Sequence, residues 1–255
     1  MQTTLTILGT GACIPQPGDD TASYLVNGEI LIDTGWHVTE TLRRAGKTPA
    51  DIKALFFTHM HHDHMMALAA FLYERYASGN AGELTIYGPH TLPEAIENAD
   101  RYLQKQVYWP DISGAKIQVL SGSEEFEFGR VHICTMPSVH AVPGLCYCMM
   151  DTVTGRKLGF PGDGEPLPEH PAFFKDCDVL THEFSLGLSK ETGHPTRHSS
   201  IWDAARIAQE AQAAMLCPVH GPAAIKNECA EELETIYAGN VHWPKPNETF
   251  VFSAK

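Results

Sequence analysis

The amino-acid sequence predicts an α/β fold in which two mixed sheets carry helices on their outer sides, an αβ/βα sandwich. Strand-like runs follow one another with helices between them, and both halves of the chain begin with a section rich in hairpins. No linker, low-complexity tract or short-period repeat interrupts the chain, and 255 residues fit one large domain. We therefore expect a single domain over residues 1–255.

The ends of the predicted strands carry a further signal. Strand after strand ends in a histidine or an aspartate, namely His59, His140, Asp163, His182 and His220. Structural histidines have no reason to prefer strand ends, whereas groups that converge on one rim of a sheet do. This pattern predicts a functional site at one rim.

The first half of the chain gives clear element signals. The predicted strands are 5–8, 22–26, 29–32, 52–57 and 84–87, and the predicted helices are 38–45, 65–76 and 94–104. Asn27-Gly28 lies between the second and third strands, and this dipeptide strongly favours a two-residue hairpin turn.

The second half is punctuated by glycine turns. The predicted strands are 116–120, 125–128, 131–136, 145–151, 157–160, 178–181, 215–219 and 249–252, and the predicted helices are 199–214 and 225–237. Thr154-Gly155 predicts a hairpin that delivers Asp163 at its end. Ser199 is a suitable cap for the helix that follows it.

Charge and composition restrict the function classes. Hydrophobic residues make up 43% of the chain, which is ample for a core, and the formal net charge is −13. Proteins that bind nucleic acid usually carry a basic face, so this acidity makes a large RNA or DNA substrate less favoured.

The cysteines predict a reducing environment. Seven cysteines are scattered along the chain and none forms a pair separated by two residues, so neither a disulfide framework nor a thiolate zinc site is indicated. The amino terminus shows no basic region followed by a long apolar segment, and we expect neither a signal peptide nor a membrane span. These features favour a cytoplasmic protein.

The densest chemical motif follows the strand at 52–57. His59, His61, Asp63 and His64 lie within six residues of one another, on the loop where that strand ends. Two imidazoles two residues apart in an extended segment point the same way and can chelate one ion, which leaves Asp63 and His64 to turn toward a second. Imidazole and carboxylate ligands suit zinc, and also iron or manganese.

Asp33 allows two interpretations. It ends the strand at 29–32 and precedes the helix at 38–45, so it is placed to cap that helix. It is equally placed to orient a metal-bound histidine through a hydrogen bond. The residues alone leave both alternatives open.

Together these motifs resemble the metallo-β-lactamase superfamily. The residues His59, His61, Asp63, His64, His140, Asp163 and His220 appear in its order and approximate spacing, and Ile32-Asp33-Thr34-Gly35 resembles its strand-end motif. Within the superfamily the chain is most similar to ribonuclease Z and related phosphodiesterases. The segments that carry this similarity are Gly9-Thr10-Gly11, Tyr87-Gly88-Pro89, Pro161-Gly162-Asp163, His182-Glu183 and His198-Ser199-Ser200.

The resemblance implies two divalent metal ions, with zinc first and manganese or iron as alternatives. One ion would be held by His59, His61 and His140, and the other by Asp63, His64 and His220, with Asp163 bridging both. The implied reaction is attack of a metal-activated water on a phosphodiester, and Asp63 then counts with the catalytic residues.

Glu183 and His198 match the pair that transfers protons beside the metals in ribonuclease Z. His198 would donate the proton that the departing alkoxide needs, since a histidine held protonated by a carboxylate is a suitable acid. The alternatives are a polar residue that precedes a helix cap for His198 and a surface carboxylate for Glu183. The role of His182 stays open. A structural role is the default for His37, His90, His170, His194 and His242.

One departure from ribonuclease Z bears on the substrate. Those enzymes carry a long arm between the lone histidine and the bridging aspartate that grips transfer RNA, but here only a hairpin separates His140 from Asp163. The chain therefore looks like the compact relatives without an arm, similar to the anti-Pycsar-type phosphodiesterases that open cyclic nucleotides and are commonly homodimers. Aromatic candidates for stacking on a base are Trp36, Tyr108 and Trp109.

Four functions follow from these observations. The expected one is hydrolysis of small phosphodiesters, 3′,5′-cyclic nucleotides above all, to nucleoside monophosphates. A ribonuclease Z-type RNA 3′-end endonuclease and a lactone, thioester or sulfate-ester hydrolase are alternatives on the same metal site. A catalytically silent ligand-binding protein would normally have lost part of the ligand set, and all seven expected ligands are present here.

Overall fold

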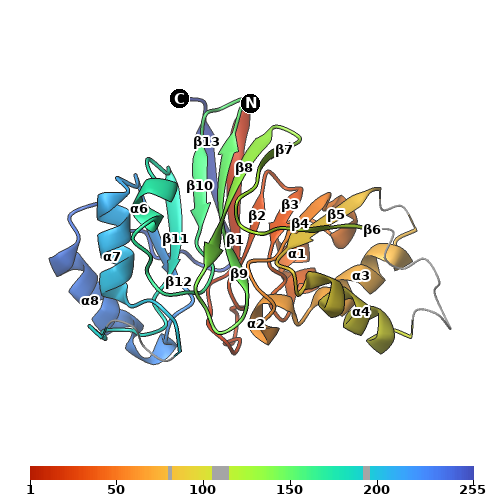
Figure 1. Ribbon diagram of the computed structural model, residues 1–255, viewed down its shortest axis with the longest axis horizontal. Helices are drawn as coiled ribbons and strands as arrows, with labels where there is room; N and C mark the ends of the chain where they lie inside the picture. Colours follow the sequence, from red (N-terminus) through yellow and green to blue (C-terminus); the bar gives the residue numbers. More distant parts are fainter. Residues whose placement is uncertain (80–81, 105–114, 192–195) are drawn as a thin grey trace. The chain divides into compact units, whose positions relative to one another are not determined.

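The computed structural model describes residues 1–79, 82–104, 115–191 and 196–255. They form two compact units, each with one mixed sheet and its own helices (Figure 1). The N-terminal unit consists of Thr4–Leu120 and Lys245–Val251, and the C-terminal unit consists of Met1–Thr3, Ser121–Pro244 and Phe252–Lys255. Two mixed sheets with helices are what the sequence predicts.

The N-terminal unit has a seven-stranded sheet in the order β13-β1-β2-β3-β4-β5-β6. Its strands are β1 (Gln2–Gly9), β2 (Ser23–Val26), β3 (Ile30–Ile32), β4 (Ala54–Phe56), β5 (Leu84–Gly88), β6 (Ala115–Val119) and β13 (Glu248–Ser253). Strands β1 to β3 are antiparallel neighbours, and β3 to β6 pair in parallel. The predicted β2–β3 hairpin forms, with Asn27 and Gly28 at φ of 52° and 70°, as a turn with two left-handed central residues requires.

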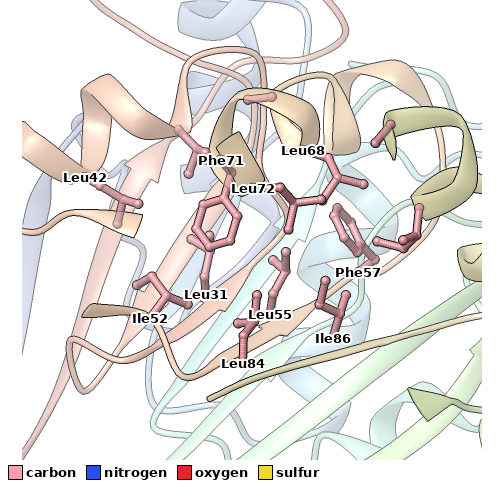
Figure 2. Packing of buried hydrophobic residues seen from close by; sticks show 14 of the residues in the cluster. Leu31, Leu42, Ile52, Leu55, Phe57, Leu68, Phe71, Leu72, Leu84 and Ile86 are labelled. Atoms are coloured by element: carbon pink, nitrogen blue, oxygen red, sulfur yellow. The ribbon is translucent and has the colours of Figure 1, made fainter. Parts of the chain in front are cut away.

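Helices cover this sheet with an apolar layer. They are α1 (Val38–Arg44), α2 (His62–Met65), α3 (Leu68–Ala77) and α4 (Leu92–Tyr102), with the 3₁₀ turn η1 (Pro49–Asp51). Figure 2 shows Leu55 and Phe57, two residues apart on the strand side, packed with Phe71 and Leu72 of α3. Each of these four side chains is fully buried, and burying one such side chain contributes about 1.5–3 kcal/mol.

The helix predicted over 65–76 is split in the structure. Helix α2 ends at Met65 and α3 begins at Leu68. The N–H of Ala67 donates to the carbonyl of Gly35 (3.0 Å) instead of continuing the helix, and the carbonyl of Asp63 accepts from Thr21 Oγ1 (2.6 Å). Tertiary hydrogen bonds thus replace helical ones, and Asp63 and His64 lie on a separate short helix and not on the loop that the sequence predicts.

The C-terminal unit has a six-stranded sheet in the order β12-β11-β10-β9-β8-β7. Its strands are β7 (Glu125–Phe128), β8 (Val131–Ser138), β9 (Gly144–Asp151), β10 (Lys157–Phe160), β11 (Val179–Glu183) and β12 (Leu216–Val219). The run β7 to β10 is antiparallel, and β10, β11 and β12 are parallel. The β9–β10 hairpin around Thr154-Gly155 is confirmed.

Helix α7 is the centre of the helical layer of this unit. The helices are α6 (His170–Phe173), α7 (Ile201–Glu210) and α8 (Lys226–Ile236), with the 3₁₀ turn η2 (Ala223–Ile225), and α7 contacts α6, α8, β11 and β12. Ser200 and Asp203 form a capping box at its start, so the helix begins after Ser200 and not at the predicted 199. Its alanine-rich buried face, Ala204, Ala205 and Ala208, allows close approach to the sheet.

No helix among the described residues is long and apolar enough to cross a membrane.

Candidate metal centre

The loop after β4 holds the imidazoles of the N-terminal unit close together. The ring centroids of His59 and His61 are 4.8 Å apart, and those of His59 and His64 are 4.0 Å apart. His64 Nε2 lies 3.7 Å from Asp63 Oδ2. This is close to the spacing of about 3.4 Å expected for two ligand atoms on one zinc ion. By contrast, His62 points outward, with 54% of its side chain exposed.

Asp33 holds this cluster in place through three hydrogen bonds. Its carboxylate accepts from the N–H of Thr58 (2.8 Å), from Thr58 Oγ1 (2.7 Å) and from His64 Nδ1 (2.8 Å). Since the single hydroxyl proton of Thr58 goes to Asp33, Thr58 Oγ1 accepts from His59 Nδ1 (3.1 Å). One buried carboxylate therefore holds the Nδ1 side of two histidines, directly for His64 and through Thr58 for His59.

This arrangement decides between the two interpretations of Asp33. Helix α1 has no side-chain cap, and the N–H groups of Trp36 and His37 at its start donate to Asp20 (3.1 and 2.8 Å). Asp33 is therefore an orienting carboxylate and not a helix cap. Burial raises its pKa, an effect that outweighs the lowering by His64 and Thr58. Asp20, and not Asp33, accepts the N–H groups of the two residues that precede this helix.

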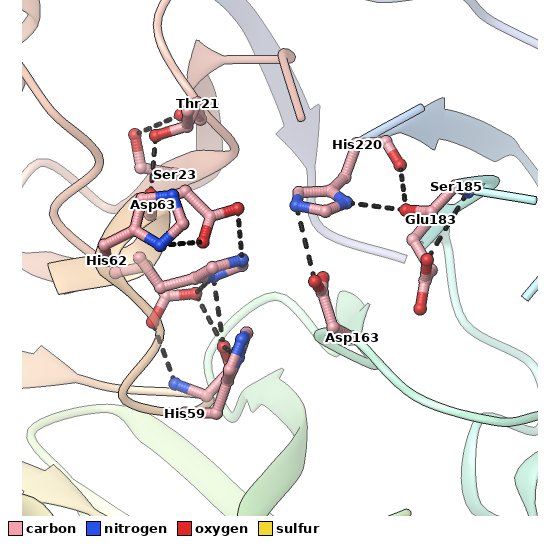
Figure 3. A network of polar contacts seen from close by, with 12 residues as sticks. Thr21, Ser23, His59, His62, Asp63, Asp163, Glu183, Ser185 and His220 are labelled. Atoms are coloured by element: carbon pink, nitrogen blue, oxygen red, sulfur yellow. Dashed lines mark hydrogen bonds and ion pairs between the residues drawn. The ribbon is translucent and has the colours of Figure 1, made fainter. Parts of the chain in front are cut away.

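The C-terminal unit brings together His140, Asp163, His198 and His220. Asp163 Oδ2 lies 3.3 Å from His220 Nε2 and 3.8 Å from His198 Nδ1 (Figure 3 shows the contact with His220). Ligand atoms of His140, Asp163 and His198 all lie within 4.8 Å of one another. These side chains come from segments as far apart in sequence as 140 and 220, as the strand-end pattern predicts.

Each histidine here is also held at Nδ1. His140 Nδ1 donates to the carbonyl of Arg197 (2.9 Å). Ser185 Oγ donates to the carbonyl of His220 (2.9 Å) and therefore accepts from His220 Nδ1 (2.9 Å; Figure 3). His220 and Arg197 have φ of 48° and 53°, a left-handed conformation that is uncommon for residues other than glycine and that the surrounding hydrogen bonds hold here.

Glu183 and His198 form the predicted pair. His198 Nδ1 lies 2.8 Å from Glu183 Oε2, and Glu183 is only 2% exposed, so it is not a surface carboxylate. Glu183 Oε1 also accepts the N–H of Gly164 (2.7 Å), next to Asp163. Burial lowers the pKa of His198, but the hydrogen bond and charge of Glu183 raise it more, and the net pKa is raised.

His182 belongs to a different environment. It lies inside β11, where successive side chains point to opposite faces, so it faces away from the side of Glu183. Its Nδ1 donates to the carbonyl of Glu183 (2.8 Å), and its buried Nε2 has no hydrogen-bond partner among the described residues. Burial lowers its pKa. The role of His182, which the sequence leaves open, is thus not shared with Glu183, whose side chain lies on the other face of the sheet.

Of the aromatic residues predicted to stack on a base, the structure describes only Trp36. Trp36 is half-buried, with its ring 6.0 Å from that of His62. Tyr108, Trp109 and His194 lie outside the described residues. Sequence reasoning missed Thr58, Ser185 and Arg197, because no spacing rule marks a hydroxyl or carbonyl that supports a histidine through its other nitrogen.

The donor set fits divalent metal ions. Four histidines have Nδ1 occupied by an oxygen acceptor, and this is how proteins fix the tautomer and direction of a metal-ligating Nε2. Carboxylates lie within 3.3–3.7 Å of Nε2 in both units. Within each unit, the nitrogen and oxygen donors are those that zinc, manganese and iron accept.

Comparison with known proteins identifies the family. Residues 29–221 match the model of the beta-lactamase superfamily domain. Ribonuclease Z from Methanocaldococcus jannaschii is 25% identical, with 96% of this chain and 92% of the relative covered. Ribonuclease BN from Cronobacter sakazakii is also 25% identical, with 85% and 88% covered.

Among solved structures, the fold is similar to that of the metallo-β-lactamase fold protein YhfI from Bacillus subtilis. The TM-score is 0.83 at 22% identity, with 98% of this chain and 100% of that chain covered. The predicted fold class and the predicted relationship to ribonuclease Z are both confirmed. The chain therefore belongs to the metallo-β-lactamase superfamily and is a metal-dependent hydrolase.

Proposed function

We propose that the chain is a dinuclear metal-dependent phosphodiesterase that hydrolyses small phosphodiesters, with 3′,5′-cyclic nucleotides as the substrate class. In this proposal the two units act as one domain over residues 1–255. The first metal would be held by His59, His61 and His140, and the second by Asp63, His64 and His220, with Asp163 as a ligand shared by both. Support comes from the two half-sets of ligands, each ordered within its own unit.

The observation that carries the proposal is the hydrogen bond between the buried Glu183 and the partly exposed His198. When bound, two divalent ions lower the pKa of water at the site and neutralise charge on a phosphoryl oxygen. The leaving alkoxide still needs a proton, and Glu183 favours the protonated form of His198. His198 is 20% exposed at its side chain and so can be reached by a substrate. A leaving group that requires such an acid is typical of a phosphodiester.

The short connection between His140 and Asp163 favours a small substrate. All residues from 140 to 163 are described, and they form only β9, β10 and their tight turns. The alignment with the archaeal ribonuclease Z spans 299 positions, more than the 255 residues of this chain, so that relative contains residues that this chain lacks. The net charge of −13 also disfavours a long polyanionic substrate.

RNA 3′-end cleavage is the second candidate. It is favoured by the names of the relatives, ribonuclease Z and ribonuclease BN, whose sequences align over most of this chain. It requires a surface that grips transfer RNA without an arm between His140 and Asp163.

The finer details also belong to the proposal. Zinc is the metal that we expect first, with manganese or iron as alternatives. A cytoplasmic setting is supported by the seven free cysteines, including Cys148 and Cys177, whose sulfur atoms are 4.0 Å apart without a bond. A homodimer is the oligomeric state that we expect.

The decisive test is hydrolysis of a panel of 3′,5′-cyclic nucleotides by the metal-loaded protein, with His198→Ala as the matched variant. We expect a nucleoside monophosphate as product, unchanged metal content in the variant, and turnover lower by about a hundredfold or more. Cleavage of precursor transfer RNA, but of no cyclic nucleotide, would support the second candidate. Activity on lactones or sulfate esters alone, or loss of metal in His198→Ala, would contradict the proposal.

A further inference from the structure

A second group of side chains that could bind a metal ion lies on strands β7 and β8, and none of its members belongs to the proposed catalytic ligands. Glu125 is on β7, and His132 and Cys134 are on β8. The register pairs Glu125 directly with Cys134. Because His132 and Cys134 are two residues apart on one strand, all three side chains lie on the same face of the sheet. Strand β7 is the last strand of this sheet, so the group lies at its edge.

The three ligand atoms are already gathered. His132 Nε2 is 2.8 Å from Glu125 Oε1, Cys134 Sγ is 3.6 Å from His132 Nε2, and Cys134 Sγ is 3.7 Å from Glu125 Oε1. In a tetrahedral zinc site with bonds of about 2.0–2.3 Å, ligand atoms are separated by about 3.4–3.6 Å. The two distances to sulfur match this spacing, and only the hydrogen-bonded nitrogen–oxygen pair must open by about half an ångström.

The surroundings suit a cation that takes three protein ligands and keeps one coordination position open. His132 and Cys134 are half-buried, whereas Glu125 has 68% of its side chain exposed and can adjust to an ion. Burial first, and then the nearby Cys148 and Glu125, raise the pKa of the Cys134 thiol to about 11. The metal-free thiol is thus protonated, and binding of a cation would release its proton to solvent.

We propose that Glu125, His132 and Cys134 form a zinc-binding site, separate from the catalytic ligands, that cross-links edge strand β7 to β8. The combination of thiolate, imidazole and carboxylate selects zinc over magnesium or calcium, which prefer oxygen ligands alone. The fourth position is open to water. The bound ion would fix an edge strand that has little other burial, because successive side chains of β7 alternate between exposed and half-buried.

Cobalt(II) substitution tests the proposal in the full-length protein. The proposed catalytic ligands are all nitrogen and oxygen, so a thiolate-to-cobalt charge-transfer band in the near ultraviolet reports only a cysteine-containing site. We expect this band in the wild type, its loss in Cys134→Ser, and its loss or marked weakening in His132→Gln. Cys13→Ser is the matched control, because Cys13 is the exposed cysteine of the chain, and it should keep the band.

Zinc stoichiometry gives an independent measurement. After equilibrium dialysis, elemental analysis should find one more zinc per chain in the wild type than in Cys134→Ser, with hydrolytic activity equal in the two proteins. Added zinc should also raise the melting temperature of the wild type more than that of the variant. Equal zinc content in both proteins, or a cobalt band that persists in Cys134→Ser and disappears in Cys13→Ser, would overturn the site.

Discussion

Asp33 Oδ2 lies 2.8 Å from His64 Nδ1, and the same carboxylate accepts two hydrogen bonds from Thr58. Asp33 has φ of 55°, so the backbone leaves β3 in a left-handed conformation at this residue. A single residue at a strand end thus sets the direction of His64 and, through Thr58, of His59.

Replacement of Asp33 by alanine should therefore weaken metal binding without removing a ligand. We expect metal affinity to fall by about 10–100-fold, because His64 loses the acceptor that fixes its tautomer and ring orientation. Competition with a chromophoric chelator measures the change. Asp51→Ala, an exposed carboxylate of the same unit, is the control and should leave affinity unchanged. Equal affinities for wild type and Asp33→Ala would show that the hydrogen bond is not a determinant of binding.

Replacement of Asp163 by alanine should release metal outright. In the proposed centre this carboxylate serves both ions, and its Oδ2 lies 3.3 Å from His220 Nε2. We expect at least one metal per chain to be lost in elemental analysis, while Glu234→Ala, on the exposed side of α8, retains the wild-type content. Full metal occupancy in Asp163→Ala would disprove the bridging role.

Replacement of Glu183 by glutamine should act on turnover and not on metal content. Glutamine can still accept the N–H of Gly164, but it carries no charge to favour a protonated His198. We expect kcat to fall by about a hundredfold with KM nearly unchanged. A steady-state comparison with His198→Ala and with the double variant checks the pairing. The two single losses should not add, and additive losses would mean that the residues act separately.

His170 makes stability depend on pH. It is buried in the C-terminal unit, and burial first, then His182 and Arg206, lower its pKa to about 3. The unfolded chain takes up this proton near pH 6.5, whereas the folded chain does not until about pH 3. Between these values the unfolded state binds more protons, so the free energy of unfolding decreases as the pH falls, by about 1.4 kcal/mol per pH unit from this group.

The variant His170→Asn should flatten that slope. It keeps a polar atom near the position of Nδ1, which accepts from the N–H of Leu167 (3.4 Å), but it cannot take up a proton. Urea unfolding at several pH values between 4 and 7 measures the effect. His90→Gln, which replaces an exposed histidine, should retain the wild-type slope. A slope in His170→Asn equal to that of the wild type would refute the assignment.

The strands could be predicted well because their signals are local. β7 and β10 have the predicted bounds, since glycine turns lie close to both strands in the sequence. The split between α2 and α3 could not be predicted, because it depends on Gly35 and Thr21, which are distant in sequence from Ala67 and Asp63. The helical pattern over 65–76 is a local signal and does not report these tertiary hydrogen bonds.

The candidate site also combines features that the sequence reveals with features that it does not. Histidines and aspartates at strand ends are visible in the sequence, and the structure orders most of them within their units. The sequence leaves the role of His182 open, and strand alternation turns its side chain to the other face from Glu183. Ser185 and Arg197 escape notice because one acts through a hydroxyl and the other through a backbone carbonyl, features that sequence spacing does not reveal.

The left-handed backbone at Arg197 has a consequence for laboratory evolution. An arginine at φ of 53° costs about 1–2 kcal/mol relative to a relaxed residue, and this conformation presents its carbonyl to His140. Glycine or asparagine adopts the same conformation at lower cost, but neither can replace the hydrogen bond that Arg197 Nη1 donates to the carbonyl of His140 (3.1 Å). A selection for heat resistance alone should therefore accumulate glycine or asparagine at position 197, whereas a selection that also requires activity should retain the arginine.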